Sequence, residues 1–377
     1  IIYQIMANNR EQIKEWEAEL SKTKYNKRTQ HSIGLLKAKI AKAKEKEIAR
    51  SSKKSIHQGY SVRRTGDATV IMVGFPSSGK STLLNAITNA ESPVGDYEFT
   101  TLDVIPGLME YKGAKIQILD VPGIVRGAAS GKGRGKEVLS VMRNADMVML
   151  LIDVDRPQAL KVIQKEIYDS LLRLNQRKPD VKIKKTGRGG IRIGRTVSTP
   201  DLTDETIVAM LKEFKMSNAD VLIRTKINAD QFIDIVESNK MYVPGITIMN
   251  KIDLEVPDIK EGDVDKFIEL EKKYDVDIAI SGHNKVNLNA LRELIFRRMD
   301  FIRIYCKEVS KPADMGEPLI LRDGDTLKRM CEKLHKDFVK KFRYARVWGP
   351  SVKYDGQKVV KILHALKDKD VVELHIG

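Results

Sequence analysis

The chain has 377 residues, enough for roughly two to four domains with apolar cores. It contains no run of about 18 apolar residues, which excludes a membrane-spanning helix, and nothing in it resembles a cleavable signal peptide. Its two cysteines, Cys306 and Cys331, are too few for a disulfide framework and predict a reducing, cytoplasmic environment.

The formal net charge of +16 is concentrated near the N-terminus. Residues 1–66 hold 16 Lys and Arg against 6 Asp and Glu, a net of +10. This excess predicts a polyanionic partner, RNA or a ribosome, and the alternative is an ordinary solvated helical surface. Apolar residues recur at helical spacing in two stretches, which predicts a basic helical hairpin and linker over residues 6–66. These residues are Ile13, Trp16 and Leu20, then Leu35, Leu36, Ile40 and Ala43.

A strand predicted over residues 68–73 leads into a glycine-rich loop and then a helix starting near Thr82. The loop reads Gly74-Phe75-Pro76-Ser77-Ser78-Gly79-Lys80-Ser81. Glycine permits the tight turn that aims successive N–H groups at a phosphate, and the positive end of the following helix favours the same anion. In such a loop Lys80 reaches the β- and γ-phosphates and the Ser81 hydroxyl ligates magnesium.

Acidic and hydroxyl residues with a role at the γ-phosphate follow this loop. Asp120-Val121-Pro122-Gly123 comes after the strand predicted over residues 115–120. There Asp120 would hold magnesium through water and the Gly123 N–H would sense the γ-phosphate. Thr100 and Thr101 follow a loop over residues 95–99, and one of their hydroxyls could reach magnesium when the γ-phosphate holds that loop.

A base-recognition motif, Asn250-Lys251-Ile252-Asp253, ends another predicted strand. The Asp253 carboxylate can accept two hydrogen bonds from the N1–H and N2 amino groups of guanine, whereas adenine offers no such pair. Asn250 and Lys251 would support the base and the loop. Ser281-Gly282-His283 follows the next strand, where backbone N–H groups would read the guanine O6.

Alternating strands and helices predict a mostly parallel sheet with ligands at the carboxyl ends of its strands. Residues 67–175 and 239–300 fit this pattern, whereas residues 176–238 do not and are expected to form an inserted α+β module. Within the insert, residues 182–197 look like a basic hairpin that closes on three glycines, either a second RNA-facing surface or a soluble loop.

Residues 301–377 are expected to form a separate α+β domain without a catalytic constellation. Asp325 is placed to cap a helix whose apolar face contains Leu327, Met330, Cys331 and Leu334. Trp348 is expected in the core of this domain.

Ile124, directly after the DxxG glycine, cannot hydrogen-bond the attacking water, whereas GTPases resembling Ras place a glutamine there. We therefore expect slow hydrolysis of the bound nucleotide. The group that orients the attacking water would be supplied by a partner, another loop or a monovalent cation. The glycine-rich residues 127–136 are expected to change order with the γ-phosphate.

Four of these segments together resemble the developmentally regulated GTP-binding proteins, in the Obg group of translation-factor-related GTPases. They are residues 74–81 (GFPSSGKS), 97–102 (YEFTTL), 120–135 (DVPGIVRGAASGKGRG) and 250–253 (NKID).

The resemblance implies an N-terminal helical hairpin, a P-loop GTPase domain, an inserted module like ribosomal S5 domain 2, and a C-terminal β-grasp TGS domain. It also implies that Thr101, rather than Thr100, is the magnesium ligand. Arg126 stands where many Obg-like proteins have an acid. Ser77 matches a position that contacts potassium in relatives, where asparagine is expected.

The sequence thus predicts a cytoplasmic GTPase that uses Mg²⁺, with K⁺ as an additional candidate, and slowly hydrolyses GTP to GDP. Lys80, Thr101 and Gly123 are the predicted catalytic residues. Expected partners are GTP and GDP, a ribosome or RNA, and a regulatory protein. The main alternative is a nucleotide-gated RNA or ribosome adaptor in which hydrolysis is incidental, and a further one is an ATP-using phosphotransferase.

Overall fold

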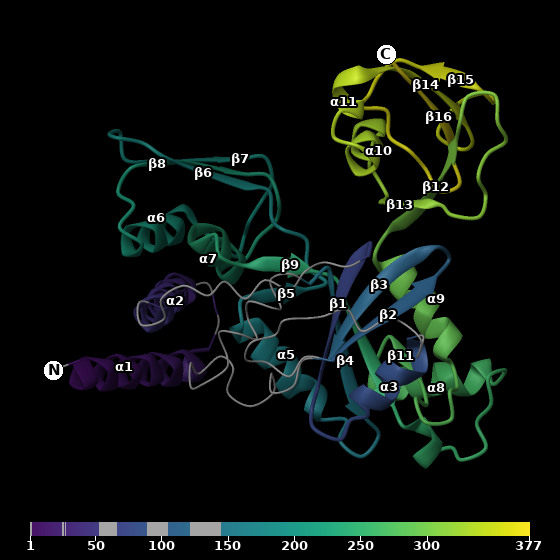
Figure 1. Cartoon of the computed structure of the whole chain (residues 1–377). Coiled ribbons are helices and arrows are strands. Elements are labelled where there is room, and N and C mark those ends of the chain that lie inside the picture. Colours follow the sequence, from purple (N-terminus) through teal and green to yellow (C-terminus); the bar gives the residue numbers. More distant parts are fainter. Residues whose placement is uncertain (1, 25, 27, 53–65, 89–104, 121–144) are drawn as a thin grey trace. The chain divides into compact units, whose positions relative to one another are not determined.

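A computed structural model describes residues 2–24, 26, 28–52, 66–88, 105–120 and 145–377 (Figure 1). The expectations for Thr100, Thr101, Gly123, Ile124 and Arg126 lie outside these residues. The chain forms two compact units, residues 1–59 with 171–242 and residues 60–170 with 243–377. None of the helices in the described ranges has both the length and the apolarity that crossing a membrane requires.

The second unit is built on a six-stranded sheet in the order β11-β10-β4-β1-β3-β2. All neighbours run parallel except β2, which is antiparallel to β3. Every residue of β1 and β4 is buried, as expected for strands covered on both faces. The mostly parallel α/β sheet predicted from the sequence is therefore confirmed. Its strands are β1 (Ala68–Gly74), β2 (Ile105–Tyr111), β3 (Ala114–Asp120), β4 (Met147–Asp153), β10 (Gly245–Asn250) and β11 (Ile278–Ala279).

Helices pack against this sheet and complete its core. Three side chains of the helix after β1 are at most 2% exposed and join the buried strand residues in one cluster. They are Leu83, Leu84 and Ile87. The helices are α3 (Lys80–Ile87), α5 (Ala159–Asp169), α8 (Val264–Tyr274) and α9 (Leu288–Arg298), with the 3₁₀ turn η1 (Ile252–Leu254).

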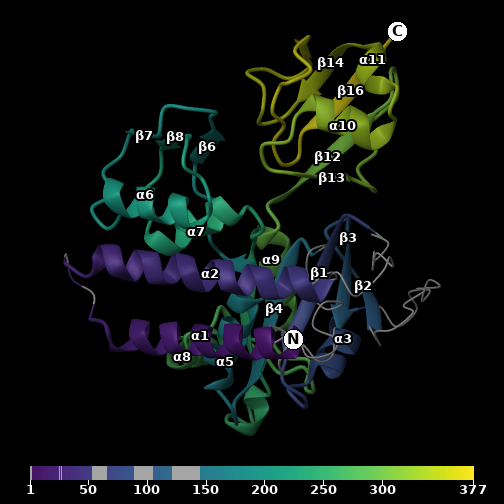
Figure 2. The same ribbon diagram turned by 90° about the vertical axis from the view of Figure 1, so that its left-hand side faces the viewer.

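The first unit joins two N-terminal helices to the inserted segment. Helix α1 (Ile2–Lys22) packs on α2 (Gln30–Ser52), and α2 packs on α6 (Asp204–Glu213) and α7 (Ala229–Glu237), as Figure 2 shows. The approach is close at Gly34, where a Cβ would lie 2.6 Å from Thr206 Cγ2. Lys37 and Lys42 of α2 form ion pairs with Asp230 and Glu213, so part of its positive charge is used inside the unit.

The expected hairpin over residues 182–197 is wrong. β6 (Val181–Lys185) and β7 (Ile191–Arg195) do not pair with each other, because β8 (Ala219–Ile223) lies between them. β8 is the most apolar of the three, and its buried Ala219, Val221 and Ile223 favour the centre of the sheet. The basic strands take the edges, where charged side chains stay in water and discourage further pairing.

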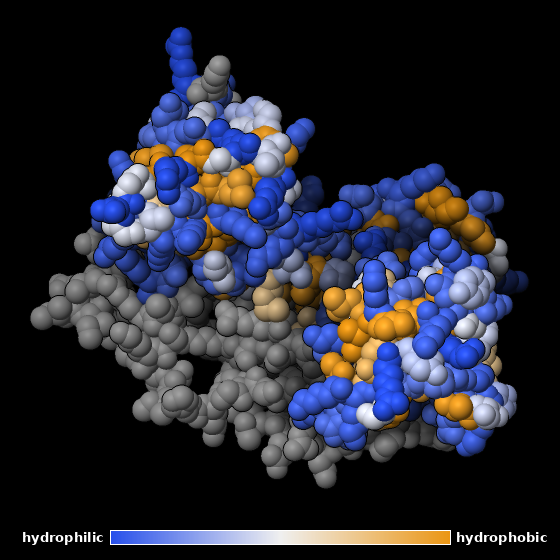
Figure 3. All heavy atoms as spheres, turned by 90° about the horizontal axis from the view of Figure 1, so that it is seen from above, coloured by the Kyte–Doolittle hydropathy of each residue, from blue (hydrophilic) through white to orange (hydrophobic). Residues whose placement is uncertain are grey.

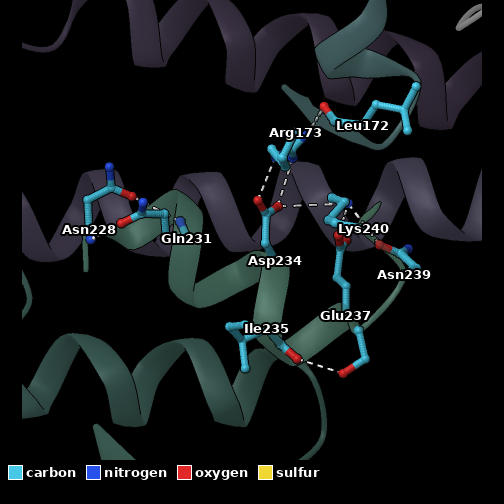
Figure 4. Close-up of polar contacts among 10 residues, drawn as sticks. Leu172, Arg173, Asn228, Gln231, Asp234, Ile235, Glu237, Asn239 and Lys240 are labelled. Carbon is cyan, nitrogen blue, oxygen red and sulfur yellow. Dashed lines mark hydrogen bonds and ion pairs between the residues drawn. The ribbon is translucent and has the colours of Figure 1, made fainter. Parts of the chain in front are cut away.

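The insert begins and ends in a two-stranded ribbon of β5 (Leu172–Leu174) and β9 (Met241–Val243). A buried ion pair fixes this ribbon to α7 (Figure 4). Arg173 Nε and Nη2 donate to the two carboxylate oxygens of Asp234 at 2.6 and 2.8 Å, and both side chains are at most 5% exposed. Lys240 lies 4.0 Å from Asp234 Oδ1 and also pairs with Glu237.

The C-terminal domain is a five-stranded sheet in the order β13-β12-β16-β14-β15. Two of its expected details are wrong. The residue before α10 is Thr326, while the Asp325 carboxylate accepts the Arg322 N–H at 2.9 Å and holds the preceding turn. Trp348 lies opposite the buried Val347 on β14, away from the core cluster. The elements are β12 (Phe301–Lys307), β13 (Leu319–Arg322), α10 (Leu327–Leu334), α11 (Phe338–Lys341), β14 (Phe342–Trp348), β15 (Gln357–Val359) and β16 (Val371–Ile376).

Candidate nucleotide-binding site

The polar motifs lie together at one edge of the six-stranded sheet. The strand ends are staggered in a row: Asp120 is level with Met72 and Met149, Gly74 with Leu151, and Asn250 with Asp153. Because these strands are parallel, their carboxyl ends share this edge, where open α/β sheets bind ligands.

The loop between β1 and α3 has the backbone shape of a phosphate-binding loop. Ser77 and Gly79 have φ angles of 67° and 88°, which turn the chain back on itself. A Cβ on Gly79 would lie 2.4 Å from Asn250 Nδ2, so only glycine fits there. Lys80 opens α3, and its ammonium donates to the Gly74 and Phe75 carbonyls at 3.2 and 3.3 Å. Lys80 therefore lies across the loop in which a phosphate would sit.

Ser81 and Asp120 form an oxygen-rich pair beside Lys80. Ser81 Oγ donates to Asp120 Oδ2 at 3.2 Å. The other carboxylate oxygen, Asp120 Oδ1, is buried and has no hydrogen-bond partner among the described residues. Burial raises the pKa of Asp120, and the Lys80 charge and the Ser81 hydrogen bond partly oppose that rise.

This pair fits a magnesium ion. Mg²⁺ prefers hard oxygen ligands, and proteins commonly hold it through one or two protein oxygens together with substrate phosphates. The described ranges contain no cluster of three or more His, Cys, Asp or Glu side chains, so there is no all-protein metal cage in that part of the chain. A hydroxyl and a carboxylate with an unpaired oxygen are the donors that a magnesium–nucleotide complex requires.

Asn250 connects the phosphate loop to the loop after β11. Its Nδ2 donates to the Ser78 carbonyl at 2.9 Å, and its Oδ1 accepts the Gly282 N–H at 3.0 Å. Asn250 is 2% exposed, so both bonds are shielded from water. One side chain thus fixes the separation of two loops that contact opposite ends of a nucleotide in the sequence-based hypothesis.

The Asp253 carboxylate is oriented by a neighbouring hydroxyl. Ser281 is fully buried, and its Oγ donates to Asp253 Oδ1 at 2.5 Å. The Asn284 N–H in turn donates to Ser281 Oγ at 3.0 Å. A carboxylate oxygen keeps further lone pairs after accepting one bond, so Asp253 can still accept hydrogen bonds from a base.

The expected O6-reading segment is already engaged in part. The Ser281 N–H donates to the Val286 carbonyl at 3.2 Å, and the Gly282 N–H is taken by Asn250. Of the three residues predicted to read O6, His283 alone keeps an N–H without an acceptor among the described residues.

Sequence reasoning missed Asp153 at the end of β4. Asp153 is 6% exposed, and its Oδ2 lies 3.6 Å from Lys251 Nζ. The Lys251 backbone has a φ of 63°, in the left-handed region that is strained for residues other than glycine. The ion pair with Asp153 holds the Lys251 side chain on this turn. The sequence pattern that could have indicated it is an aspartate at the end of an apolar strand: Asp153 ends β4 as Asp120 ends β3.

Comparison with known proteins relates this site to established families. A model described as a 50S ribosome-binding GTPase matches residues 69–185, and one described as the C-terminal region of that domain matches residues 188–301. A TGS-domain model matches residues 302–376.

Related proteins match almost the whole chain. An uncharacterized GTP-binding protein of Methanocaldococcus jannaschii is 50% identical over 97% of this chain and 92% of its own length. Developmentally-regulated GTP-binding protein 1 of Xenopus laevis is 40% identical over 98% of this chain and 99% of its own. The chain belongs to the developmentally regulated GTP-binding protein family.

Membership in this family makes the chain a GTP-binding protein with a P-loop GTPase domain and a C-terminal TGS domain. The human developmentally-regulated GTP-binding protein 2 is 38% identical over 97% of this chain and 98% of its own. Among solved structures, the Schizosaccharomyces pombe YchF GTPase covers 85% of this chain and is itself covered completely, with 14% identity and a TM-score of 0.46. The near-full-length relatives confirm the family resemblance inferred from the motifs.

Proposed function

We propose that this protein binds GTP with Mg²⁺ at the β1–α3 edge, slowly hydrolyses it to GDP, and uses the nucleotide state to control docking to a ribosome or RNA. The observation that carries the catalytic part is the Ser81–Asp120 pair beside Lys80. A hydroxyl and a cation at the start of α3 meet there a carboxylate with an unpaired oxygen at the end of β3.

In this proposal the side chains bind and orient GTP rather than bond to it. Lys80 and the loop N–H groups neutralise charge on the phosphates as water attacks, and Asp253 selects guanine. Ser81, and Asp120 through a water molecule, would hold magnesium, whose charge would offset that of the phosphates. The further magnesium ligand Thr101 and the γ-phosphate contact of Gly123 remain sequence-based predictions, as does slow hydrolysis from Ile124.

Charge supports the ribosome or RNA part of the proposal. The N-terminal excess of +10 is joined by basic edge strands in the insert, where Lys182, Lys184 and Arg192 are exposed. The matched GTPase model is itself described as ribosome-binding. Co-sedimentation with ribosomes in GDP and in a non-hydrolysable GTP analogue tests this part, and equal sedimentation in both would contradict nucleotide control.

Two substitutions test the site. Lys80→Ala should abolish nucleotide binding, with Lys260→Ala on an exposed turn as the matched control. Asp253→Asn should remove discrimination between guanine and other purines, with Asp258→Asn as its control. If Asp253→Asn left base preference unchanged, the guanine-reading role would be wrong and an ATP-using phosphotransferase would regain support.

The alternative hypothesis, a nucleotide-gated RNA or ribosome adaptor, predicts a different kinetic result from the switch. If hydrolysis is incidental, single-turnover GTP cleavage should be the same with and without ribosomes; acceleration by ribosomes supports the switch. Replacing Na⁺ by K⁺ in the same assay tests the cation predicted at Ser77, which is exposed on the phosphate loop. A cytoplasmic location is also proposed, in keeping with the two free cysteines, whose pKa values are raised by burial.

A further inference from the structure

Asp153, at the end of β4, is a buried charge to which the proposed mechanism gives no role. Charged side chains usually stay in water, and Figure 3 shows a molecular face that is mainly hydrophilic, with scattered apolar patches. Asp153, in contrast, is 6% exposed, and its Oδ1 is buried without a hydrogen-bond partner among the described residues. Burying a carboxylate in this way is costly, so its presence at the edge of a ligand site points to a role in that site.

Strand β4 places Asp153 between the phosphate loop and the base-recognition motif. Gly74, where β1 passes into the phosphate loop, is level with Leu151, so β4 continues for two residues beside that loop. On the other side, Asp153 is level with Asn250, the last residue of β10. Lys251 follows directly. Asp153 therefore borders both segments that are expected to hold the nucleotide.

Lys251 is the partner of this carboxylate. Its Nζ lies 3.6 Å from Asp153 Oδ2, and among the described residues neither side chain forms another ion pair. The Asp153 side chain is 8% exposed and that of Lys251 30%, so water and salt screen the pair only in part. A lysine side chain loses much rotamer freedom when it is held in one place, so a fixed ammonium needs an anchor. Asp153 supplies that anchor, while the Lys251 backbone is set by its left-handed turn.

We propose that Asp153 is a positioning residue, which holds the Lys251 stem against the bound guanine and thereby slows the release of GDP and GTP. With the ammonium anchored at Asp153, the methylene groups of Lys251 form a fixed apolar surface beside the base. Without the anchor, the same side chain moves and packs on the base for only part of the time. This inference rests on the nucleotide site proposed above and on the support of the base expected there from Lys251.

Repulsion of the nucleotide is the competing explanation for the same carboxylate. Asp153 lies beside the phosphate loop, so its negative charge also acts on the phosphates of GDP. If this repulsion were its main effect, neutralising Asp153 would slow nucleotide release. The ion pair argues against that outcome, because the Lys251 ammonium compensates the carboxylate charge at 3.6 Å. Positioning and repulsion thus predict changes of opposite sign.

The rate of GDP release distinguishes these two roles. Fluorescent GDP bound to the whole chain with Mg²⁺ is displaced by excess unlabelled GDP, and its dissociation is followed by stopped flow. Asp153→Asn keeps the size of the side chain but cannot form the ion pair, and we expect dissociation to become about tenfold faster. Asp155→Asn makes the same change on an exposed side chain and should leave the rate within about twofold. A slower or unchanged rate in Asp153→Asn would overturn the proposal.

A double-mutant cycle shows whether Asp153 acts through Lys251. Lys251→Met keeps an apolar stem but has no charge to anchor, so it should also speed GDP release. In that background Asp153→Asn should bring no further acceleration, because the interaction is already absent. The same acceleration with and without Lys251 would contradict positioning, since Asp153 would then act only on the stability of the sheet edge. Melting temperatures in excess GDP show whether each variant is folded. If Asp153→Asn is not, Asp153→Glu, which displaces the charge by one methylene group, replaces it in the cycle with the same expected signs.

Inosine diphosphate separates this proposal from the guanine-reading role of Asp253. Hypoxanthine has the ring plane of guanine but lacks its N2 amino group. Asp153→Asn should therefore speed the release of GDP and of inosine diphosphate by the same factor, whereas Asp253→Asn should change their ratio. A changed ratio in Asp153→Asn would contradict the positioning role. If Lys251→Met left release unchanged, the expected support of the base by Lys251 would fail together with this proposal. Acceleration by Lys251→Met without acceleration by Asp153→Asn would overturn this proposal alone.

Discussion

The ion pair between Arg173 and Asp234 can be tested by removing its partners singly and together. Both side chains are buried, and two parallel hydrogen bonds join them (Figure 4). Removing one partner leaves the other charge buried without its main counter-charge, which typically costs about 3–5 kcal/mol. Replacing both by apolar residues removes the desolvation cost as well, and such changes are often close to neutral. We therefore expect Arg173→Met and Asp234→Leu to be strongly destabilising and their combination to be mild.

The surroundings predict which single change is worse. In Arg173→Met, Asp234 still faces Lys240 at 4.0 Å. In Asp234→Leu, Arg173 and Lys240 both lose the carboxylate that they share, so this variant should be the less stable of the two. The exposed pair Arg192 and Asp220 has the same fork geometry with side chains 73% and 41% exposed, and its removal should cost less than about 1 kcal/mol.

Hydrogen exchange of the α7 amides is the suitable assay, because it reports local opening in a chain with several domains. A loss of about 3–5 kcal/mol corresponds to exchange that is roughly 10² to 10³ times faster or more. If Arg173→Met exchanged like Arg192→Met, or if the double variant exchanged as fast as the worse single variant, the buried ion pair would not have the energetic role assigned to it.

Three further outcomes follow from the nucleotide site and its surroundings. Asn250→Ala leaves the Ser78 carbonyl and Gly282 N–H unpaired at about 1–3 kcal/mol each, so fluorescent-GDP affinity should fall roughly 10²-fold, and a change below threefold would contradict the clamp. Because burial raises the Asp120 pKa, protons should displace magnesium as pH falls through a value above that of an ordinary aspartate, and Asp120→Asn should lack this pH dependence in magnesium titrations. Lys112 and its neighbours lower the Glu293 pKa from 4.5 to about 2, so stability should fall as pH drops from 4.5 towards 2, and Glu293→Gln should flatten that part of the thermal-melting profile.

The sequence was informative wherever chemistry depends on neighbours along the chain. The phosphate loop, Asp120 and Asn250–Asp253 each occupy a few consecutive residues at the end of an apolar strand. Their position at one sheet edge follows from parallel pairing alone. The family and the mostly parallel sheet could therefore be predicted, and both are confirmed. The individual site roles remain predictions.

Interactions between residues far apart along the chain could not be predicted from local sequence patterns. Val181 pairs with Ile223, and this pairing places β8 between two strands that look like a hairpin. Asn250 contacts the Ser78 carbonyl across 172 positions, a bond that no local pattern indicates. Asp325 resembles a helix cap, yet its carboxylate satisfies the nearer Arg322 N–H. The expected domain bounds remain predictions. The N-terminal helices and the insert, which were expected as separate parts, share one compact unit.

The β5–β9 ribbon has a consequence for how the chain folds. Strands β4 and β10 are neighbours in the central sheet, yet Val148 pairs with Gly245, 97 positions later. Joining them across an unfolded segment of that length would cost substantial loop-closure entropy and slow folding. Once the insert has folded and its ends are held together as β5 and β9, the effective loop shrinks to little more than α5. Early folding of the insert would then accelerate formation of the sheet that carries the GTP site.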